Sequence, residues 1–305
     1  MMITILGPTA TGKTKLAAGL AYLHDGEIIS ADSRQVYKGM DIGTGKDLED
    51  YYVNDRTVPY HLIDIAEPGE EYNVYAFQQD FIRAYQHITA KEKLPFLCGG
   101  TGMYLEAVLK GYKLIEVPEN HSLRQQFLHK SDEELQRMLL EMRKSPHNTT
   151  DLTDRKRIIR AIEIEKYYQE HPELPHDFPE IRHLILGVQF ERAELRQRIT
   201  ERLKARLKEG LLEEVHYLLS SGLNPDQLKF YGLEYRYVTE YVNGEIDYNT
   251  MFTNLNTAIH QFAKKQVTWF RRMQRKGFQI HWIDGKKTNA DKLSEASHII
   301  QHHKE

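Results

Sequence analysis

Short apolar runs alternate with amphipathic helical patterns along most of the chain. The runs are rich in β-branched and aromatic residues, as strands are: MITIL, GEIIS, HLIDI, LPFLCGG, HLILGVQF and FQIHWI. Between them, apolar residues recur at helical spacing, most clearly over Ala193–Leu219 and Tyr248–Met273, each of which predicts one long helix. Buried strands alternating with helices predict an α/β fold with a mostly parallel sheet flanked by helices on both faces.

The strand pattern is interrupted between Tyr112 and Arg182, where the sequence is helical and rich in charge. Prolines mark both ends of this stretch, namely Pro118 near its start and Pro172, Pro175 and Pro179 near its end. We therefore expect an inserted all-helical domain at residues 113–182, within a catalytic core formed by residues 1–112 and 183–305.

The first apolar run leads into a loop that matches G-x-x-x-x-G-K-[ST]. This loop, called the cradle below, comprises Gly7, Pro8, Thr9, Ala10, Thr11, Gly12, Lys13 and Thr14. Its glycines permit backbone torsions and close approaches that let successive N–H groups converge on phosphate oxygens. Lys13 adds a positive charge, and Thr14 begins a helix, where its hydroxyl can ligate a phosphate-bound Mg²⁺. The motif predicts a P-loop that binds a diphosphate or a longer polyphosphate.

The composition is that of an ordinary globular chain, with 305 residues of which 40% are hydrophobic and 28% are charged. The N-terminal apolar run is too short for a signal peptide, and no stretch approaches the roughly 20 apolar residues of a membrane span. We expect a cytoplasmic protein without membrane contact. Cys98 is the single cysteine, which excludes an intrachain disulfide, and its apolar surroundings favour a buried residue over a nucleophile.

Positive charge lies mainly outside the first third of the chain, although the net charge is −3. Residues 1–110 carry 10 Lys and Arg against 15 Asp and Glu, and the remainder carries 31 against 29. Basic residues gather in three clusters: Arg155, Lys156, Arg157 and Arg160; the series from Arg192 to Lys208; and Lys264, Lys265, Arg271, Arg272, Arg275 and Lys276. Each cluster fits a solvated helix face or a contact with the RNA backbone.

Four blocks in this order resemble the tRNA dimethylallyltransferase family, also called tRNA isopentenyltransferases. They are GPTATGKT, DSRQVYKGMDIGTGK from Asp32 to Lys46, GGTGMYLEAV from Gly99 to Val108, and AKKQVTWFR from Ala263 to Arg271. The resemblance covers nearly the whole chain. It implies that the cradle holds the pyrophosphate of dimethylallyl diphosphate with Mg²⁺. The prenyl group is then expected to move to the exocyclic amine of the adenosine next to the anticodon of tRNA.

The resemblance also implies roles for single residues. Asp32 corresponds to the general base, Arg198 to an arginine that contacts the pyrophosphate, and Thr101 to a group on the same rim of the sheet. The implied tRNA contacts are Asp32, Ser33, Arg34, Gln35, Thr101, Arg124, Lys156, Arg157, Ile158, Ile159 and Arg160. From the residues alone, Asp32 also fits a turn, Thr101 also fits a helix cap, and Asp64 fits either a structural role or a water-mediated Mg²⁺ contact.

The chain departs from the family pattern towards its C-terminus. His260 and Lys265 stand where arginines are expected, and the glycine-tyrosine-arginine element appears as FYGLEYR from Phe230 to Arg236. Arginine and lysine are not equivalent in bidentate phosphate contacts, so the contacts of this region need not be retained.

Two other functions fit the cradle. A P-loop and a doubly wound sheet also suit a small-molecule or nucleotide kinase, in which Asp32 would assist phosphoryl transfer. A nucleotide-gated RNA-binding module without covalent chemistry is a third interpretation. The family resemblance favours a prenyltransferase that acts as a monomer on the anticodon stem-loop.

Overall fold

The computed structural model describes residues 1–142, 152, 154–173 and 178–304. The chain divides into two compact units. The first comprises Met1–Tyr112 with Pro179–Glu305, and the second comprises Lys113–Phe178. Pro175, in the loop predicted to end the inserted domain, lies outside the described residues.

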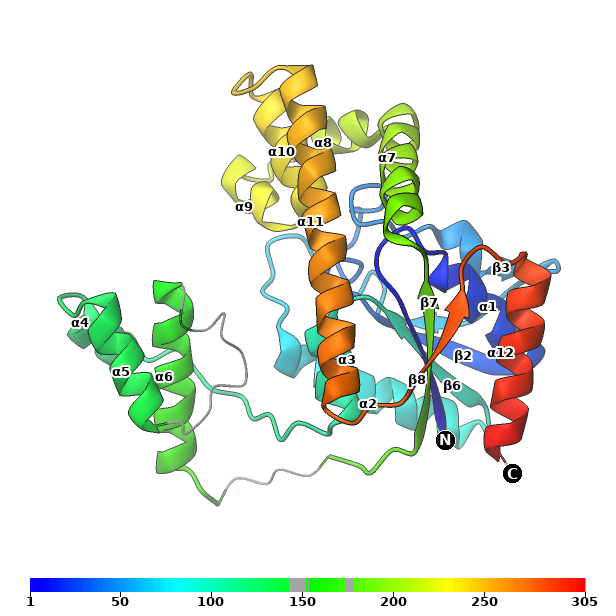
Figure 1. The fold of residues 1–305 in the computed structure, drawn as a ribbon. Helices are drawn as coiled ribbons and strands as arrows, with labels where there is room; N and C mark the ends of the chain where they lie inside the picture. The colour runs from blue at the N-terminus through cyan, green and yellow to red at the C-terminus, as the bar shows by residue number, and fades with distance from the viewer. Residues whose placement is uncertain (143–151, 153, 174–177, 305) are drawn as a thin grey trace. The chain divides into compact units, whose positions relative to one another are not determined.

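Six parallel strands form the sheet of the first unit, in the order β5-β2-β6-β1-β7-β8 (Figure 1). The strands are β1 (Met2–Leu6), β2 (Gly26–Ala31), β5 (Tyr60–His61), β6 (Leu94–Gly99), β7 (His183–Gln189) and β8 (Ile280–Asp284). Every residue of β1 and β2 is buried, which explains their unbroken apolar runs. A separate antiparallel pair consists of β3 (Tyr52–Val53) and β4 (Arg56–Thr57).

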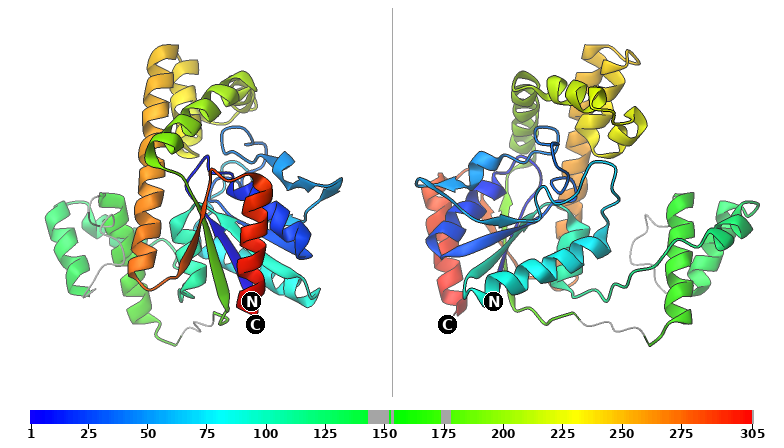
Figure 2. Two further views of the ribbon diagram at one scale, coloured as in Figure 1. Left: turned by 45° about the vertical axis from the view of Figure 1, so that its right-hand side comes forward. Right: turned by 180° about the vertical axis from the view of Figure 1, so that it is seen from behind.

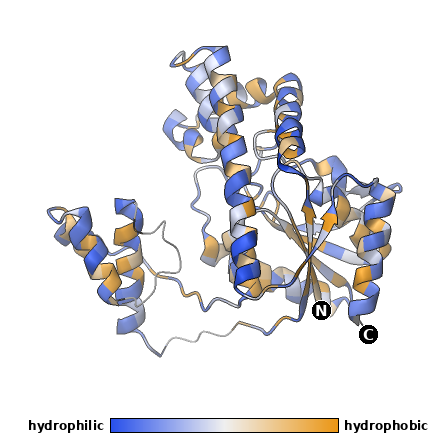
Figure 3. Ribbon diagram, in the orientation of Figure 1, coloured by the Kyte–Doolittle hydropathy of each residue, from blue (hydrophilic) through white to orange (hydrophobic). Residues whose placement is uncertain are grey.

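Helices cover both faces of this sheet (Figures 1 and 2). α1 (Lys13–Leu23) and α12 (Asn289–Lys304) pack on one face. α2 (Val74–Ala90) and α3 (Gly102–Leu109) pack on the other, and α11 (Tyr248–Arg275) lies against α3. The predicted α/β class is confirmed. Figure 3 shows hydrophobic residues along the strands and hydrophilic residues over much of the outer helices. None of the described helices is long and apolar enough to cross a membrane.

A group of helices continues beyond the carboxyl ends of the strands. It contains α7 (Arg192–Lys208), α8 (Leu211–Ser220), α9 (Pro225–Phe230), α10 (Leu233–Val242) and the first half of α11. The prediction of one helix over Ala193–Leu219 is wrong, because the chain breaks at Gly210 with φ of +109°. A glycine adopts this left-handed conformation without the steric penalty of a side chain, and it lets α8 start in a new direction.

The predicted strand HLIDI is also shorter than expected, since only Tyr60–His61 pairs with β2. Leu62 and Asp64 have φ values of +63° and +55°, which a continuing strand cannot accommodate. A short 3-10 helix, η1 (Leu48–Tyr51), precedes the antiparallel pair on the way to this segment.

All described regular elements of the second unit are helices: α4 (His121–Phe127), α5 (Asp132–Met142) and α6 (Arg155–Glu170). Their apolar faces form a separate small core, which contains Leu123, Phe127, Leu135, Leu139, Ile158 and Ile162. Side-chain caps begin all three helices, and at α5 Ser131 Oγ accepts a hydrogen bond from the Glu134 amide at 3.2 Å. Asn120 accepts a hydrogen bond from the Leu123 amide at 2.9 Å, and Asp154 accepts one from the Arg157 amide at 3.0 Å.

Candidate active site

Consecutive strands of the sheet bring together four segments that are distant in sequence. Asp32 follows β2, Thr101 follows β6, the cradle follows β1, and Arg198 lies in the second turn of α7 after β7. The carboxyl ends of neighbouring parallel strands meet at one edge, where open α/β sheets bind their ligands. The predicted catalytic residues and the cradle therefore share one rim of the sheet.

The cradle turns sharply out of β1 and into α1. A side chain at Gly7 would place its Cβ 2.8 Å from Thr11 Oγ1 and 2.9 Å from the Val188 carbonyl oxygen, so only glycine fits there. Gly12 has φ of +74° at the start of α1, and Ala10 also has a positive φ of +62°. Among the described residues no side chain caps the N-terminus of α1. Its first N–H groups therefore remain for an anion.

Gln266 of α11 holds the cradle to the neighbouring loop. Its Oε1 accepts a hydrogen bond from the Thr9 amide at 2.9 Å, and its Nε2 donates one to the Gly100 carbonyl at 3.0 Å. The side chain is buried, and a Cβ on Gly100 would lie 2.5 Å from Gln266 Nε2. Sequence reasoning assigned no role to Gln266, although it stands inside the block AKKQVTWFR that carries the family resemblance.

Asp32 and Lys13 influence one another electrostatically. Burial lowers the pKa of Lys13, and the nearby Cys98 and Asp32 oppose this shift. Asp32 Oδ1 accepts a hydrogen bond from the Arg34 amide at 3.0 Å, which fixes the orientation of the carboxylate in a tight turn. Asp32 is therefore a turn residue whose partly exposed carboxylate lies beside the cradle.

Thr101 joins the ends of β2 and β6. Its Oγ1 accepts a hydrogen bond from the Ser33 amide at 3.2 Å, and its own amide donates to the Ala31 carbonyl at 3.4 Å. Thr101 is the N-cap residue of α3 by position, but its side chain makes no capping hydrogen bond within the described part of the chain. The structure thus ties Thr101 to the segment that carries Asp32.

Three arginines at successive turns of α7 face the cradle and the loop of residues 41–47. Arg198 Nε donates to the Ala10 carbonyl at 3.0 Å, and its guanidinium lies 4.5 Å from the centre of the Phe190 ring. Arg202 donates to Thr9 Oγ1 at 3.1 Å and pairs with Asp47 at 2.6 Å. Arg206 pairs with the other oxygen of Asp47 at 2.9 Å. Sequence reasoning chose Arg198 alone, although the four-residue spacing places all three on one helix face.

Glu214 of α8 orders the start of the same loop. Its carboxylate accepts hydrogen bonds from the amides of Asp41, Ile42 and Gly43 at 2.9, 2.8 and 2.9 Å. It also accepts one from the Tyr235 hydroxyl at 2.7 Å. The divergent segment from Phe230 to Arg236 therefore supports the loop through Tyr235, a role that the sequence did not reveal.

Lys46 closes the other end of this loop. Its side chain is 1% exposed, and its ammonium donates to the Tyr37 carbonyl at 2.6 Å and pairs with Asp41 at 2.8 Å. Lys46 also pairs with Asp64. Of the two roles left open for Asp64, the structural one matches this contact, because the carboxylate already holds a buried cation.

The other residues near Asp32 have different surroundings. Gln35 accepts a hydrogen bond from Ser30 Oγ at 3.0 Å and donates to the Gly45 carbonyl at 2.9 Å, so its side chain bridges β2 to the loop. Ser33 and Arg34 instead line an open cavity of about 650 Å³, in which the Arg34 guanidinium lies 5.5 Å from the centre of the Phe230 ring.

In the second unit, two of the arginines predicted to contact tRNA hold a buried carboxylate. Arg124 Nε pairs with Glu163 at 2.7 Å and Arg160 pairs with it at 3.1 Å. The Glu163 side chain is 0% exposed. Burial alone would raise the pKa of Glu163, but hydrogen bonds from Arg124 and Arg160 hold it below its usual value. Much of the hydrogen-bonding capacity of both arginines thus serves the fold of the unit.

Lys156 and Arg157 are exposed on the same helix, and neither forms an ion pair within the described residues. Ile158 is 1% exposed and packs in the core of the unit, where Ile159 packs against it. Of the predicted series from Lys156 to Arg160, the first two residues therefore offer free cationic groups, whereas the Ile158 side chain does not reach the surface.

His260 and Lys265, the other two departures from the family pattern, face different environments. His260 Nε2 lies 3.1 Å from the Arg196 carbonyl oxygen and ties α11 to α7. Lys265 is exposed. Trp269 is half-buried and packs against Gly102 at the start of α3, whereas Phe270 is fully buried.

Cys98 lies beneath the cradle and is not a reactive thiol. Burial raises the pKa of Cys98 to about 12, and the positive charge of Lys13 together with a hydrogen bond from the Thr14 side chain only partly offsets this. Thiol reactivity requires the thiolate, which is therefore scarce near neutral pH. No cluster of three or more His, Cys, Asp or Glu side chains that could hold a metal is found among the described residues.

The comparisons with known proteins identify the family. The sequence profile described as IPP transferase matches residues 35–273, which is more than half of the chain. The chain belongs to this family. This match includes Thr101, Arg198 and the second unit, whereas the cradle and Asp32 precede it.

Similar relatives match along nearly the whole chain. A tRNA dimethylallyltransferase 2 of Bacteroides fragilis is 57% identical over 293 residues, which cover 96% of this chain and 95% of the relative. One from Phocaeicola vulgatus is 56% identical and covers 98% of this chain and 97% of the relative. Among solved structures, the full-length tRNA isopentenylpyrophosphate transferase from Bacillus halodurans has a TM-score of 0.72 and 30% identity, covering 99% of this chain and 95% of that one. The predicted family is confirmed.

Proposed function

We propose that the protein transfers a dimethylallyl group from dimethylallyl diphosphate to the exocyclic 6-amino group of the adenosine 3′-adjacent to the anticodon (adenosine-37) in tRNA. Diphosphate is the second product. The observation that carries the proposal is the shared rim: a phosphate cradle, a carboxylate and two arginines, Arg198 and Arg202, meet where four neighbouring parallel strands end. Membership of the IPP transferase family supports the same reaction.

The cradle and α7 bind the diphosphate in this proposal. The uncapped N-terminus of α1 and Lys13 supply N–H groups and positive charge, and Arg198 and Arg202 border the outer side of the loop. As the bond between the allylic carbon and the diphosphate oxygen breaks, negative charge grows on the leaving group. The fixed cations stabilise this charge without having to reorganise.

Thr14 is the residue that would hold Mg²⁺. Its hydroxyl stands at the first turn of α1, and the described residues supply no carboxylate cluster for a metal. This donor set fits a magnesium ion whose other ligands are diphosphate oxygens and water. When bound, Mg²⁺ would neutralise charge on the diphosphate.

Asp32 accepts the proton in the proposed mechanism. The adenosine amine forms a bond to the allylic carbon while the carbon–oxygen bond to the diphosphate breaks, and one amine proton passes to the Asp32 carboxylate. The hydrogen bond from the Arg34 amide holds the carboxylate towards the rim, and Thr101 holds the Ser33 backbone next to it. The arrangement supports transfer only when the adenine lies between Asp32 and the cradle.

The proposed tRNA surface uses the cations that are free of buried partners. In the second unit these include the exposed Lys156 and Arg157. In α11 they are the exposed Lys264, Lys265, Arg271 and Arg275, whereas Arg272 and Lys276 pair with the buried Glu106 at 2.9 and 2.7 Å. The proposal includes an anticodon stem-loop as the RNA element, a monomeric enzyme and a cytoplasmic location, where tRNA is available.

The test is a direct transfer assay. Purified protein is incubated with unmodified tRNA, Mg²⁺ and radiolabelled dimethylallyl diphosphate, and nuclease digestion then locates the label. We expect label in a single adenosine beside the anticodon. A parallel incubation with ATP labelled in its γ-phosphate tests phosphoryl transfer. Phosphate transfer without prenyl transfer would identify a kinase and reject the proposal.

A further inference from the structure

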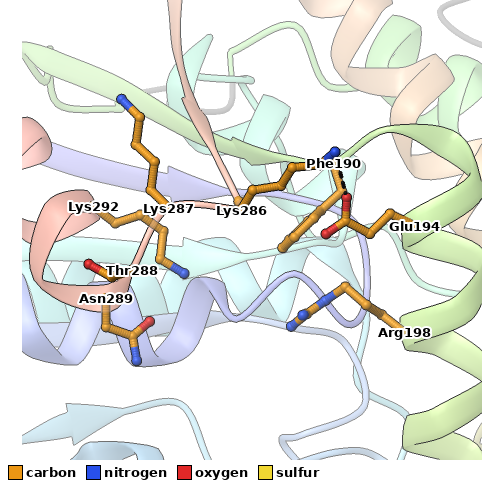
Figure 4. A pocket seen from close by; sticks show the side chains of 9 residues that line it. Phe190, Glu194, Arg198, Lys286, Lys287, Thr288, Asn289 and Lys292 are labelled. Atoms are coloured by element: carbon orange, nitrogen blue, oxygen red, sulfur yellow. Dashed lines mark ion pairs between the residues drawn. The ribbon is translucent and has the colours of Figure 1, made fainter.

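A second cavity lies beside the cradle, between the start of α7 and the turn that leads from β8 into α12 (Figure 4). Its volume is about 540 Å³. Four cationic side chains line it, namely Arg198, Lys286, Lys287 and Lys292, against one acidic side chain, Glu194. The cavity is therefore strongly positive.

Two of the four cations already have acidic partners. Lys286 pairs with Glu194 at 3.1 Å, and Lys287 pairs with Glu295 at 3.1 Å. Figure 4 shows the Lys287 side chain pointing away from Arg198. These two lysines contribute little net charge to the centre of the cavity, so the remaining pair determines what it attracts.

Lys292 is buried without a counterion. It is only 9% exposed, and no described residue forms a hydrogen bond or an ion pair with its ammonium group. Burial lowers the pKa of Lys292, and the positive charges of Arg198 and Lys15 lower it further. Burying a cation among other cations is unfavourable unless an anion joins them.

Arg198 faces the same space, as Figure 4 shows. Its Nε donates a hydrogen bond to the Ala10 carbonyl at 3.0 Å, and its guanidinium packs on the Phe190 ring, which restricts the orientation of the guanidinium plane. Among the described residues, no carboxylate pairs with Arg198. The Arg198 guanidinium offers several N–H donors in one plane, and the Lys292 ammonium offers a compact positive charge. Together they suit the oxygens of a phosphate group.

We propose that this cavity binds a phosphate group through Lys292 and Arg198, at a site separate from the cradle. The inference goes beyond the proposed function, since it requires no prenyl transfer. The phosphate belongs either to a small molecule or to the backbone of the RNA. Arg198 would then lie between two anions, one in the cradle and one in this cavity.

Equilibrium dialysis with radiolabelled inorganic phosphate at low ionic strength tests the site. All variants are made in the full-length Lys13→Ala protein, in which phosphate binding to the cradle is weakened. The measurement therefore reports on the cavity and does not depend on whether the cradle binds diphosphate. We expect one phosphate to bind, and Lys292→Met to weaken it by about tenfold or more, because charged hydrogen bonds to phosphate are strong. Lys287→Met is the matched control, since it removes a lysine of the same cavity that has its own acidic partner.

Thermal unfolding checks that Lys292→Met is folded and gives a second readout. Without phosphate, Lys292→Met is expected to unfold at a higher temperature than the wild type, because an unpaired buried charge has been removed. In the Lys13→Ala background, added phosphate is expected to raise the unfolding temperature of the protein with Lys292 intact and of the Lys287→Met form, but not that of the Lys292→Met form.

The salt dependence of tRNA binding identifies the source of the phosphate. If it belongs to the RNA backbone, Lys292→Met lowers the log–log slope by about 0.7–0.9. An unchanged slope together with weakened phosphate binding assigns the site to a small molecule. The proposal is overturned if Lys292→Met and Lys287→Met have equal phosphate affinities and equal salt slopes.

Discussion

Single residues of the site divide into those that meet the substrates and those that hold them in place. Asp32 belongs to the first kind in the proposed reaction, because its partly exposed carboxylate lies at the rim while one oxygen is fixed by the Arg34 amide. Gln266 belongs to the second kind, because its amide joins the cradle to the Gly100 loop from inside the protein. The two kinds respond differently to substitution.

We predict that Asp32→Asn slows the chemical step by about 10²–10⁴-fold and leaves tRNA affinity nearly unchanged. The amide keeps the size and the hydrogen bond from Arg34 but cannot accept the proton. Single-turnover transfer from dimethylallyl diphosphate is the measurement. A rate within about threefold of the wild type corresponds to less than 1 kcal/mol of barrier and would reject Asp32 as the base.

Gln266→Leu is predicted to weaken diphosphate use roughly ten- to hundredfold, since the Thr9 amide and the Gly100 carbonyl each lose a buried partner. The matched control is Gln261→Leu, which changes an exposed glutamine earlier on α11. The Michaelis constant for dimethylallyl diphosphate is the quantity to compare. Equal constants for the two variants would show that Gln266 does not position the cradle.

At the scale of elements, buried carboxylates form ion pairs with some of the arginines in each basic cluster, and those arginines are then less available to bind RNA. Glu163 draws Arg124 and Arg160 into the fold of the second unit, and Glu106 does the same to Arg272 in the first. A basic cluster in the sequence is thus a mixture of structural and exposed cations. Only the exposed members can act on a nucleic acid.

Acid is expected to weaken the second unit through Glu163. Its pKa is lowered from an ordinary 4.5, so its stabilising effect is complete above about pH 4.5 and is lost as the pH falls through the lower folded value. Glu163→Gln is predicted to cost about 1–3 kcal/mol at pH 7, less than a fully buried pair because both arginines are about one third exposed.

Hydrogen exchange of amides in α5 and α6 measures this effect, with Glu170→Gln on the exposed end of α6 as the control. The difference between Glu163→Gln and the wild type should shrink as the pH falls below about 4.5, because the wild-type carboxyl then takes up a proton in the unfolded chain and, at lower pH, in the folded protein. A difference that stays constant down to pH 3 would show that the carboxylate charge does not stabilise the unit.

The sequence predicted the strands and the cradle because both depend on local patterns. Continuous apolar runs and a strand-loop-helix motif are readable residue by residue. These partners of Arg124, Arg272 and Gln266 were not predictable, since they lie 39 to 257 residues away and meet only in the folded chain. The helix break at Gly210 was missed for a different reason. Apolar residues keep their helical spacing on both sides of Gly210, and this spacing does not reveal its left-handed backbone conformation.

At the scale of the whole molecule, the chain separates its phosphate cradle from two exposed cations of the proposed tRNA surface, Lys156 and Arg157. The cradle lies in the first unit with its own core, whereas Lys156 and Arg157 belong to the second unit with a separate core. Substitutions of exposed residues in one unit should therefore leave the packing of the other intact. This division makes the binding of the two proposed substrates separable by mutation.

We predict opposite effects for Lys13→Ala and for Lys156→Gln combined with Arg157→Gln. Lys13→Ala should weaken diphosphate use and leave tRNA affinity intact, because it removes charge only from the cradle. The double variant should weaken tRNA binding and lower the magnitude of its log–log salt slope by about 0.7–0.9 for each lost phosphate contact, with diphosphate affinity unchanged. Filter binding over a range of salt concentrations measures the tRNA affinity of each variant, and the Michaelis constant for dimethylallyl diphosphate measures its diphosphate use.

Arg160 is left unchanged in the double variant because it pairs with the buried Glu163. Removing Arg160 would destabilise the second unit, and the loss of folded protein would be mistaken for weaker tRNA binding. An unchanged slope would make Lys156 and Arg157 a solvated helix face and would shift the proposed tRNA surface to the exposed cations of α11.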